Sequence, residues 1–392
     1  MSTELPTWAD QMEALKEIGD LLLQEAERDD TDARRQDMYR YMLGAVAYGY
    51  LTYVNMDASK PTWVACWNQV LNYAGPNPDY AYKFALVDSK GTYRISGFRG
   101  STRFVEITET VRDYVVGSGK PKPSPGTYDL DMLNIAEDGY FSVVISAERP
   151  QGYDGDWWKL HPETQSLLMR QTAVDWRHEE DCRIAITRLD EAPPHTPQQM
   201  AERFSRLKDV VAGVIQMDMR LTRHYRDNHG INVCKISQLQ KSNNPFPGQV
   251  YLDGAFQIED DEALILETDL PKSCRYWQIL LADNRFATID WVNRQSSLNE
   301  AQAMIDSDGR FRAVIAARDP GVPNWLDTAG EPWGIIQMRW NHPSDAPEPQ
   351  VTKVPFSEVR QRLPADTPIV TPAQRRESLL RRNEEAQFRR LR

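Results

Sequence analysis

Apolar and polar residues change their period several times along the chain, and each change predicts a different kind of element. Residues 8–27 place apolar side chains at the three- and four-residue spacing of an amphipathic helix. Residues 32–54 predict a second helix and residues 62–73 a third, before the Gly- and Pro-containing stretch 74–79 ends the pattern. We therefore expect an N-terminal helical region over residues 1–76.

After this region the apolar period shortens to two. Residues 77–190 are rich in aromatic and β-branched side chains in alternation, which is typical of strands. Residues 191–248 predict a linker and a long helix, because Thr196 is a typical N-cap and a proline follows it. Strand-like runs resume over 249–342, and residues 343–392 read as a Pro-rich connection followed by a basic C-terminal helix.

One strand occurs twice in nearly the same form. Residues 138–150 read DGYFSVVISAERP and residues 308–320 read DGRFRAVIAARDP, with seven of thirteen positions identical. The likeness continues more loosely to a Met-Arg pair in each copy, and its alternative is a chance similarity of two strands that begin with Asp-Gly. We expect an internal duplication and an α+β fold: two related antiparallel β-sandwich or jelly-roll-like units, an N-terminal helical region and a helical insert.

Composition and charge exclude several classes of protein. The formal net charge is -11 and no basic stripe interrupts the body of the chain, so we expect no nucleic-acid partner. The four cysteines are scattered without a CxxC pair, which argues against a disulfide framework and fits a reducing cytosol. The N-terminus lacks the pattern of a signal peptide and no window approaches eighteen apolar residues. These features predict a cytoplasmic protein with no membrane segment.

Two stretches resemble a known family. Residues 77–100, NPDYAYKFALVDSKGTYRISGFRG, and residues 318–340, RDPGVPNWLDTAGEPWGIIQMRW, are similar to the bacterial domain-of-unknown-function family 1214, which is often paired with family 1254. The resemblance covers 77–190 and 249–342. It implies β-rich domains of sandwich or jelly-roll type in a bacterial, often catabolic, setting, and it implies no particular reaction.

Candidate acid–base residues come from two parts of the chain. His224 and Asp227 lie near the end of the long helix, where a fifth-residue spacing puts His224 and His229 about 140° apart on an α-helix, a poor arrangement for one metal. Capping or surface roles are the alternative for these histidines. Tyr50 belongs to a tyrosine-rich helix, and phenols can donate hydrogen bonds or act as acids.

Candidate ligand-binding residues lie near the ends of the repeated strands. The loop 318–327 is stiffened by two prolines and a glycine, and it either grips a ligand or caps its own backbone. Arg170 and Arg339 occupy matching strand positions, where they could anchor a carboxylate, sulfate or phenolate, or pair with Asp175 or Asp327. The loop supplies four candidates, Asp319, Asn324, Trp325 and Asp327, and the aromatic-rich N-terminal region supplies Trp67.

Metal and nucleotide sites receive little support. Asp29, Asp30 and Asp32 resemble an Asp-rich metal motif only superficially, and a capped helix junction is the simpler interpretation. The chain has no GxSxG elbow and no Gly-rich phosphate-binding loop. We expect no cofactor and no metal.

Three functions are consistent with these features. The first is a cofactor-independent enzyme, a lyase, isomerase or hydrolase, that uses acid/base chemistry on a hydrophobic aromatic, polycyclic or isoprenoid small molecule. Its expected catalytic residues are His224, Asp227, Tyr50, Asp319 and Asp327, and its expected substrate-binding residues are Arg170, Arg339, Asn324, Trp325 and Trp67. The others are a non-catalytic carrier or sensor of such ligands and an accessory subunit of a neighbouring catabolic enzyme. The basic tail is expected to clasp its own domain or a second copy in a homo-oligomer.

Overall fold

The computed structural model describes residues 5–25, 32–111, 123–192, 196–237 and 248–389. Its longer helices are α1 (Trp8–Glu25), α2 (Asp32–Gly49), α3 (Pro197–His224) and α6 (Pro372–Phe388), with a short α5 (Val359–Arg362) before the last. As expected, Thr196 begins α3: its side chain accepts from the Gln199 backbone in a reciprocal capping box. None of the described helices is both long and apolar enough to cross a bilayer.

The first β unit consists of two sheets. The five-stranded sheet has the order β1 (Val64–Cys66), β2 (Tyr80–Leu86), β8 (Ser166–Thr172), β4 (Phe104–Thr110) and β5 (Thr127–Asp129). The four-stranded sheet has the order β7 (Asp156–Lys159), β6 (Tyr140–Ser146), β3 (Tyr93–Phe98) and β9 (Arg183–Arg188). Side chains such as Ile107, Met169 and Ile145 are fully buried in the core between these two sheets.

The second β unit has the same construction. Its five-stranded sheet has the order β10 (Lys235–Ile236), β11 (Gln249–Gln257), β17 (Trp333–Asn341), β13 (Tyr276–Ala282) and β14 (Ser297–Asn299). Its four-stranded sheet has the order β16 (Trp325–Asp327), β15 (Phe311–Ala316), β12 (Glu262–Thr268) and β18 (Gln350–Pro355). Ile279, Met338 and Ile315 lie in the core between these sheets. Because β18 belongs to this sheet, the unit extends past residue 342.

The matching strand orders confirm the internal duplication. In each unit the repeated strand, β6 or β15, pairs in parallel with one short strand, while its other pairing is antiparallel. The Asp-Gly turn before it also recurs, with φ of 84° at Gly139 and 82° at Gly309, values that glycine adopts without steric cost. The likeness reaches further back than the strands, because α2 and α3 both end in a π-helical turn, Tyr50–Val54 and Tyr225–His229.

The expected third helix over residues 62–73 is wrong. Residues 64–66 instead form the edge strand β1, in which Val64 lies opposite Phe84 of β2. The backbone then leaves regular structure, with positive φ at Trp67 (47°) and Ala74 (60°). A short apolar run fits a helix or a strand equally well, and here the free edge of β2 decides the outcome.

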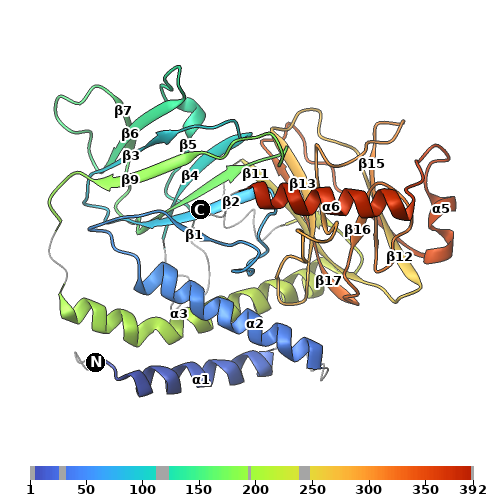
Figure 1. The fold of residues 1–392 in the computed structure, drawn as a ribbon, viewed down its shortest axis with the longest axis horizontal. Helices are drawn as coiled ribbons and strands as arrows, with labels where there is room; N and C mark the ends of the chain where they lie inside the picture. Colours follow the sequence, from blue (N-terminus) through green and yellow to red (C-terminus); the bar gives the residue numbers. More distant parts are fainter. Residues whose placement is uncertain (1–4, 26–31, 112–122, 193–195, 238–247, 390–392) are drawn as a thin grey trace.

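The two five-stranded sheets face each other across the contact between the units (Figure 1). Tyr80 Oη of the first unit donates to Gln249 Oε1 of the second at 2.8 Å. The Tyr276 ring of β13 lies 5.7 Å from the Tyr80 ring and 6.0 Å from the Phe104 ring, measured between centroids. Helices α2 and α3 pack below this contact, and α1 packs outside them.

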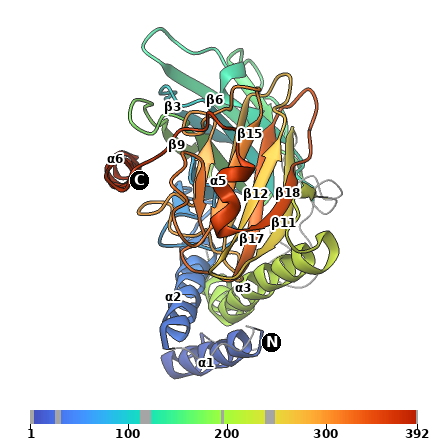
Figure 2. The same cartoon turned by 90° about the vertical axis from the view of Figure 1, so that its right-hand side faces the viewer.

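The basic C-terminal helix runs across the second unit toward the first (Figure 1) and lies on one flank of the molecule, away from α1 (Figure 2). The helix and its C-cap residue present three arginines at seven-residue intervals. Arg375 Nε donates to Asp319 of the second unit at 2.9 Å, while Arg382 Nε donates to the carbonyl of Trp291 at 2.6 Å. Farther along, Arg389 Nη1 donates to the carbonyl of Pro78 at 2.8 Å. The tail therefore clasps its own chain, one of the two expected arrangements.

Because Arg375 is buried and its neighbour Arg376 is exposed, the two arginines make a matched pair for a stability test. Arg375→Gln should lower the free energy of unfolding by about 2 kcal/mol, since it removes charge-assisted hydrogen bonds to a partly buried carboxylate. Arg376→Gln should change it by less than about 0.5 kcal/mol. Urea denaturation and limited proteolysis of α6 measure both effects, and equal values for the two variants would contradict this account of the clasp.

A buried carboxylate joins α3 to the rest of the helical layer. Asp218 is fully buried, and its carboxylate accepts hydrogen bonds from Tyr41 Oη of α2 at 2.7 Å and from the Ala74 backbone at 2.9 Å. Burial is the main cause that raises the pKa of Asp218 to about 8. In the unfolded chain the pKa of this carboxyl is about 3.9. Folding therefore takes up a proton between these two pKa values, and stability must fall as the pH rises from about 4 to about 8.

Asp218→Asn should make stability less dependent on pH. The amide cannot ionise, so the variant should gain stability relative to the natural protein as the pH rises from 5 to 8. Thermal denaturation at several pH values measures this difference. Asp209→Asn, at an exposed position of the same helix, serves as the control and should leave the pH profile unchanged. A parallel pH profile for Asp218→Asn would show that this carboxyl titrates normally.

Candidate functional site

A cavity of about 170 Å³ opens where the two units meet the helical layer. Its apolar wall includes Trp67, Phe84, Leu168, Met217, Leu221 and Phe286. Its polar wall includes Tyr80, Tyr82, Arg170, Tyr251, Gln337 and Arg339. The strands β2 and β8 of the first unit, β11 and β17 of the second and the helix α3 therefore all contribute side chains. A cavity with mostly apolar walls and a few convergent polar groups is typical of a small-molecule site.

Each unit presents a cross-strand row of three side chains to the contact between the units. In the first unit Arg170 lies opposite Tyr82 on one side and Glu106 on the other. In the second unit Arg339 lies opposite Tyr251 and Gln278. Directly opposed residues share a face of the sheet, so each row points in one direction. The two rows are equivalent by the duplication. They differ in charge at one position, where the first unit has Glu106 and the second has Gln278.

Arg170 is neutralised inside the protein. Its Nη2 donates to Glu106 Oε2 at 2.8 Å, and both side chains are almost entirely buried. A buried guanidinium requires such a partner, because an uncompensated charge in the interior costs several kcal/mol. The first unit therefore supplies, in Glu106, the carboxylate that neutralises its buried arginine.

Arg339 has a different environment. Its Nη2 donates to the carbonyl of Gly75 at 3.2 Å and to Gln337 Oε1, and its guanidinium lies 5.2 Å from the centre of the Tyr251 ring. Gln337 in turn donates to Asp253 at 2.8 Å. The Asp253 carboxylate is therefore connected to Arg339 only through the Gln337 side chain. Among the described residues, Arg339 has no ion pair with a carboxylate, and its buried Nη1 has no hydrogen-bond partner. This nitrogen can donate to a bound molecule.

The tyrosines of the cavity are neutral hydrogen-bonding groups. Burial raises the pKa of Tyr80 and of Tyr82 well above the ordinary value for a phenol. Asn77 donates its backbone N–H to Tyr82 Oη at 3.1 Å, which fixes that ring. Neutral phenols can orient a ligand, but they cannot serve as bases near neutral pH.

One carboxylate borders the cavity and turns away from it. Glu109 follows Glu106 by three residues on β4, so its side chain points to the opposite face of the sheet. There it accepts hydrogen bonds from Tyr128 Oη at 2.7 Å and from the His161 backbone at 3.1 Å. Its charge is thus directed into the first unit.

The structure brings three of the residues predicted from sequence to this cavity: Arg170, Arg339 and Trp67. The Trp67 ring makes edge contacts with Tyr82 and Phe84, at centroid distances of 5.4 and 5.2 Å. Its buried Nε1 has no hydrogen-bond partner in the described part of the chain. Its backbone has a positive φ, which is uncommon for a bulky residue, so the ring contacts with Tyr82 and Phe84 hold Trp67 in place.

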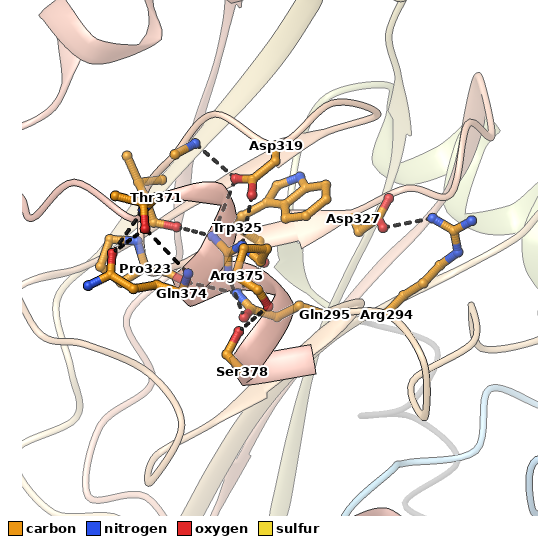
Figure 3. Close-up of polar contacts among 12 residues, drawn as sticks. Arg294, Gln295, Asp319, Pro323, Trp325, Asp327, Thr371, Gln374, Arg375 and Ser378 are labelled. Atoms are coloured by element: carbon orange, nitrogen blue, oxygen red, sulfur yellow. Dashed lines mark hydrogen bonds and ion pairs between the residues drawn. The ribbon is translucent and has the colours of Figure 1, made fainter. Parts of the chain in front are cut away.

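The four loop candidates lie elsewhere, in the second unit. Arg375 binds Asp319 and stacks over the Trp325 ring at 5.2 Å, whereas Asp327 stands apart and accepts from Arg294 at 2.9 Å (Figure 3). Asn324 donates to the backbone carbonyls of residues 304 and 312 and accepts from the residue 304 N–H. These contacts stabilise the loop and dock α6 on it, as the alternative interpretation of the loop expected.

The three remaining candidates do not line the cavity. His224 shares a hydrogen bond of 2.9 Å with Asn228, and the π-helical turn brings its ring to 5.5 Å from His229, nearer than an α-helix would. Asp227 is exposed and pairs with the neighbouring arginine at 3.1 Å. Tyr50 is half exposed on a separate surface cleft.

Among the described residues no cluster of three or more histidine, cysteine or acidic side chains could hold a metal ion. Of the Asp-rich stretch, Asp29 and Asp30 lie outside the described residues.

Sequence reasoning missed four polar residues of the cavity lining, Tyr80, Tyr82, Tyr251 and Gln337. It also missed Gln278, which lies opposite Arg339 in the sheet. One signal was available for two of the tyrosines. Residues 80–86, YAYKFAL, and residues 249–255, QVYLDGA, each carry a tyrosine at the third position. Extending the repeat to these strands would have placed Tyr82 and Tyr251 beside the two arginines.

One solved structure supports the architecture. The chain is similar to the crystal structure of an uncharacterized protein from Burkholderia cenocepacia, with 27% identity and a TM-score of 0.82, over 90% of this chain and 97% of that one. The VPA0106 protein from Vibrio parahaemolyticus aligns at 12% identity and a TM-score of 0.45, over 86% of this chain and 100% of that one. A search of functionally curated proteins found no match.

A family model matches the second β unit. The matched residues are 256–345, and the model is described as a protein of unknown function, DUF1214. This supports the resemblance to family 1214 in the second unit and leaves pairing with family 1254 without support. The residues that match the DUF1214 model thus form most of the second β unit.

Proposed function

We propose that the chain binds a small hydrophobic carboxylate, with a single aromatic or alicyclic ring, in the cavity between its two units. The observation that carries this proposal is the state of Arg339. Its guanidinium is buried in the polar wall, no described carboxylate pairs with it, and its Nη1 has no described hydrogen-bond partner. A ligand carboxylate would supply both the missing charge and the missing acceptor.

The cavity volume narrows the choice of ligand. A closed apolar cavity of roughly 150 Å³ accommodates benzene. The space of about 170 Å³ therefore suits one ring with a short acidic substituent, rather than the polycyclic or isoprenoid molecules that the sequence left open. Trp67, Phe84 and Phe286 would contact the ring, since aromatic side chains bury much area with little loss of conformational entropy.

The lining favours binding over acid–base catalysis. Tyr80 and Tyr82 stay protonated near neutral pH, and Arg170 and Glu106 are committed to each other. The candidate acid–base residues His224, Asp227 and Tyr50 lie outside the lining. A carrier or sensor is thus the best-supported function, and the expected lyase, isomerase or hydrolase activity is the second candidate, which requires a proton-transfer group that reaches the ring.

Benzoate should stabilise the protein and benzyl alcohol should not, because only benzoate carries a negative charge that can pair with the Arg339 guanidinium. Arg339→Met should lower benzoate affinity by about tenfold or more, the loss expected for a charge-assisted hydrogen bond in a buried site. Isothermal titration calorimetry and thermal shift measure both effects. Arg339→Lys retains the charge and should retain part of the affinity.

The matched control for this test is Arg294→Gln. Arg294 pairs with Asp327 outside the cavity, so its loss should leave benzoate binding unchanged. Equal responses to benzoate and benzyl alcohol, or a full benzoate response in Arg339→Met, would refute the proposed anion site.

Prolonged incubation separates a carrier from an enzyme. A bound aromatic acid should be recovered chemically unchanged after incubation at 25 °C, and mass spectrometry of the extracted mixture checks this. A new product that forms with the natural protein and not with Arg339→Met would instead establish catalysis in this cavity. His224→Ala and Asp327→Ala would then show whether the expected acid–base residues take part.

A further inference from the structure

We infer that Gln278 determines the anion selectivity of the cavity, in a position where the first unit has Glu106. This inference rests on the proposed function, because it assigns the residue that keeps Arg339 available to a ligand carboxylate. The argument comes from the duplication itself, which places two arginines in equivalent strands and surrounds them differently.

Register identifies the two positions as equivalent. Glu106 lies opposite Arg170 on β4, and Gln278 lies opposite Arg339 on β13. Both β4 and β13 occupy the fourth place in their five-stranded sheets, next to β8 and β17. The side chain beside each arginine is thus a carboxylate in one unit and its uncharged amide analogue in the other.

The amide of Gln278 has unused hydrogen-bonding capacity. The residue is fully buried, and neither its Nε2 nor its Oε1 has a hydrogen-bond partner among the described residues. A buried polar group without partners is costly, and native proteins rarely retain one without a function for it. Opposed residues in a sheet lie within about 5.5 Å of each other at Cβ, so this amide lies beside the Arg339 side chain.

These observations define the role of Gln278 through its neighbour. Arg339 lines the cavity and Gln278 does not, so Arg339 Nη1 donates to the ligand carboxylate and Gln278 acts through Arg339. The neutral amide occupies the place beside the arginine without neutralising it. In the first unit Glu106 already fills the equivalent place, so Arg170 contributes to the wall and not to anion binding.

The test exchanges the two residues and uses benzoate as the probe. Gln278→Glu should lower benzoate affinity by about tenfold or more, because the new carboxylate pairs with Arg339 and repels the anion. Gln278→Leu should change it by a much smaller factor, since it leaves the charge of Arg339 without a partner. The double exchange Glu106→Gln with Gln278→Glu should restore binding, now dependent on Arg170. Calorimetry gives each affinity, and circular dichroism reports the fold of each variant.

A measurement without ligand separates this inference from the proposed function. In a double-mutant cycle, Gln278→Glu should be tolerated beside Arg339 and should lower the melting temperature much further in Arg339→Met, where the buried carboxylate has no partner. Glu106→Gln and Arg170→Met form the matched cycle in the first unit. Additive effects of Gln278→Glu and Arg339→Met would show that the two positions do not interact, and would overturn the inference whatever the ligand.

The outcomes for the two proposals are therefore distinct. Benzoate binding that is equal in the natural protein and in Gln278→Glu overturns the role of Gln278 and leaves the anion site standing. No response to benzoate in the natural protein overturns the proposed function, and the cycle alone then decides whether positions 278 and 339 form a pair.

Discussion

Two arginine side chains buried between facing sheets impose the main constraint on this structure. Each guanidinium loses its water on folding, and the interior must replace those hydrogen bonds or the units could not pack together. Arg170 receives a carboxylate from Glu106, which neutralises its charge. Arg339 receives a carbonyl, an amide and the face of Tyr251, which leaves one nitrogen unused. The cavity lies where this second solution is incomplete.

The duplication explains how one chain contains both solutions. Its scaffold positions have kept the same role in each unit: the indole N–H of Trp157 donates to the Ser146 side chain, and that of Trp325 donates to the carbonyl of Ala316, the equivalent residue. Positions on the inner face have diverged. At the places where the second unit has Asp253 and Gln337, the first has Phe84 and Leu168. At this level of the sheets the first unit thus adds Phe84 and Leu168 to the apolar wall, whereas the second adds Gln337 to the polar wall.

Sequence alone predicts the parts of this arrangement that depend on local pattern. The period-two runs and the repeated strand indicated two β units, and the Met-Arg match identified both arginines, because strand position follows from alternation. Pairing between distant segments could not be predicted from local pattern. Residues 64–66 form a strand because they pair with the edge of β2, and Arg375 binds Asp319, which lies 56 residues away in the sequence. Nothing in the sequence singled out Gln278, because the importance of its neutral amide depends on its position opposite Arg339 in the folded sheet.

The position of α6 bears on binding although it lies outside the cavity. Because the cavity has one wall in each unit, its shape depends on how the units are held relative to each other. Arg375 fixes the helix to the second unit, while Arg382 stacks over Trp176 and Arg389 reaches Pro78, both beside the first unit's sheet. A brace of this kind reduces the freedom that a ligand would otherwise have to restrain on binding, and so favours a preformed site. The basic tail would thus support the proposed small-molecule binding from outside the cavity.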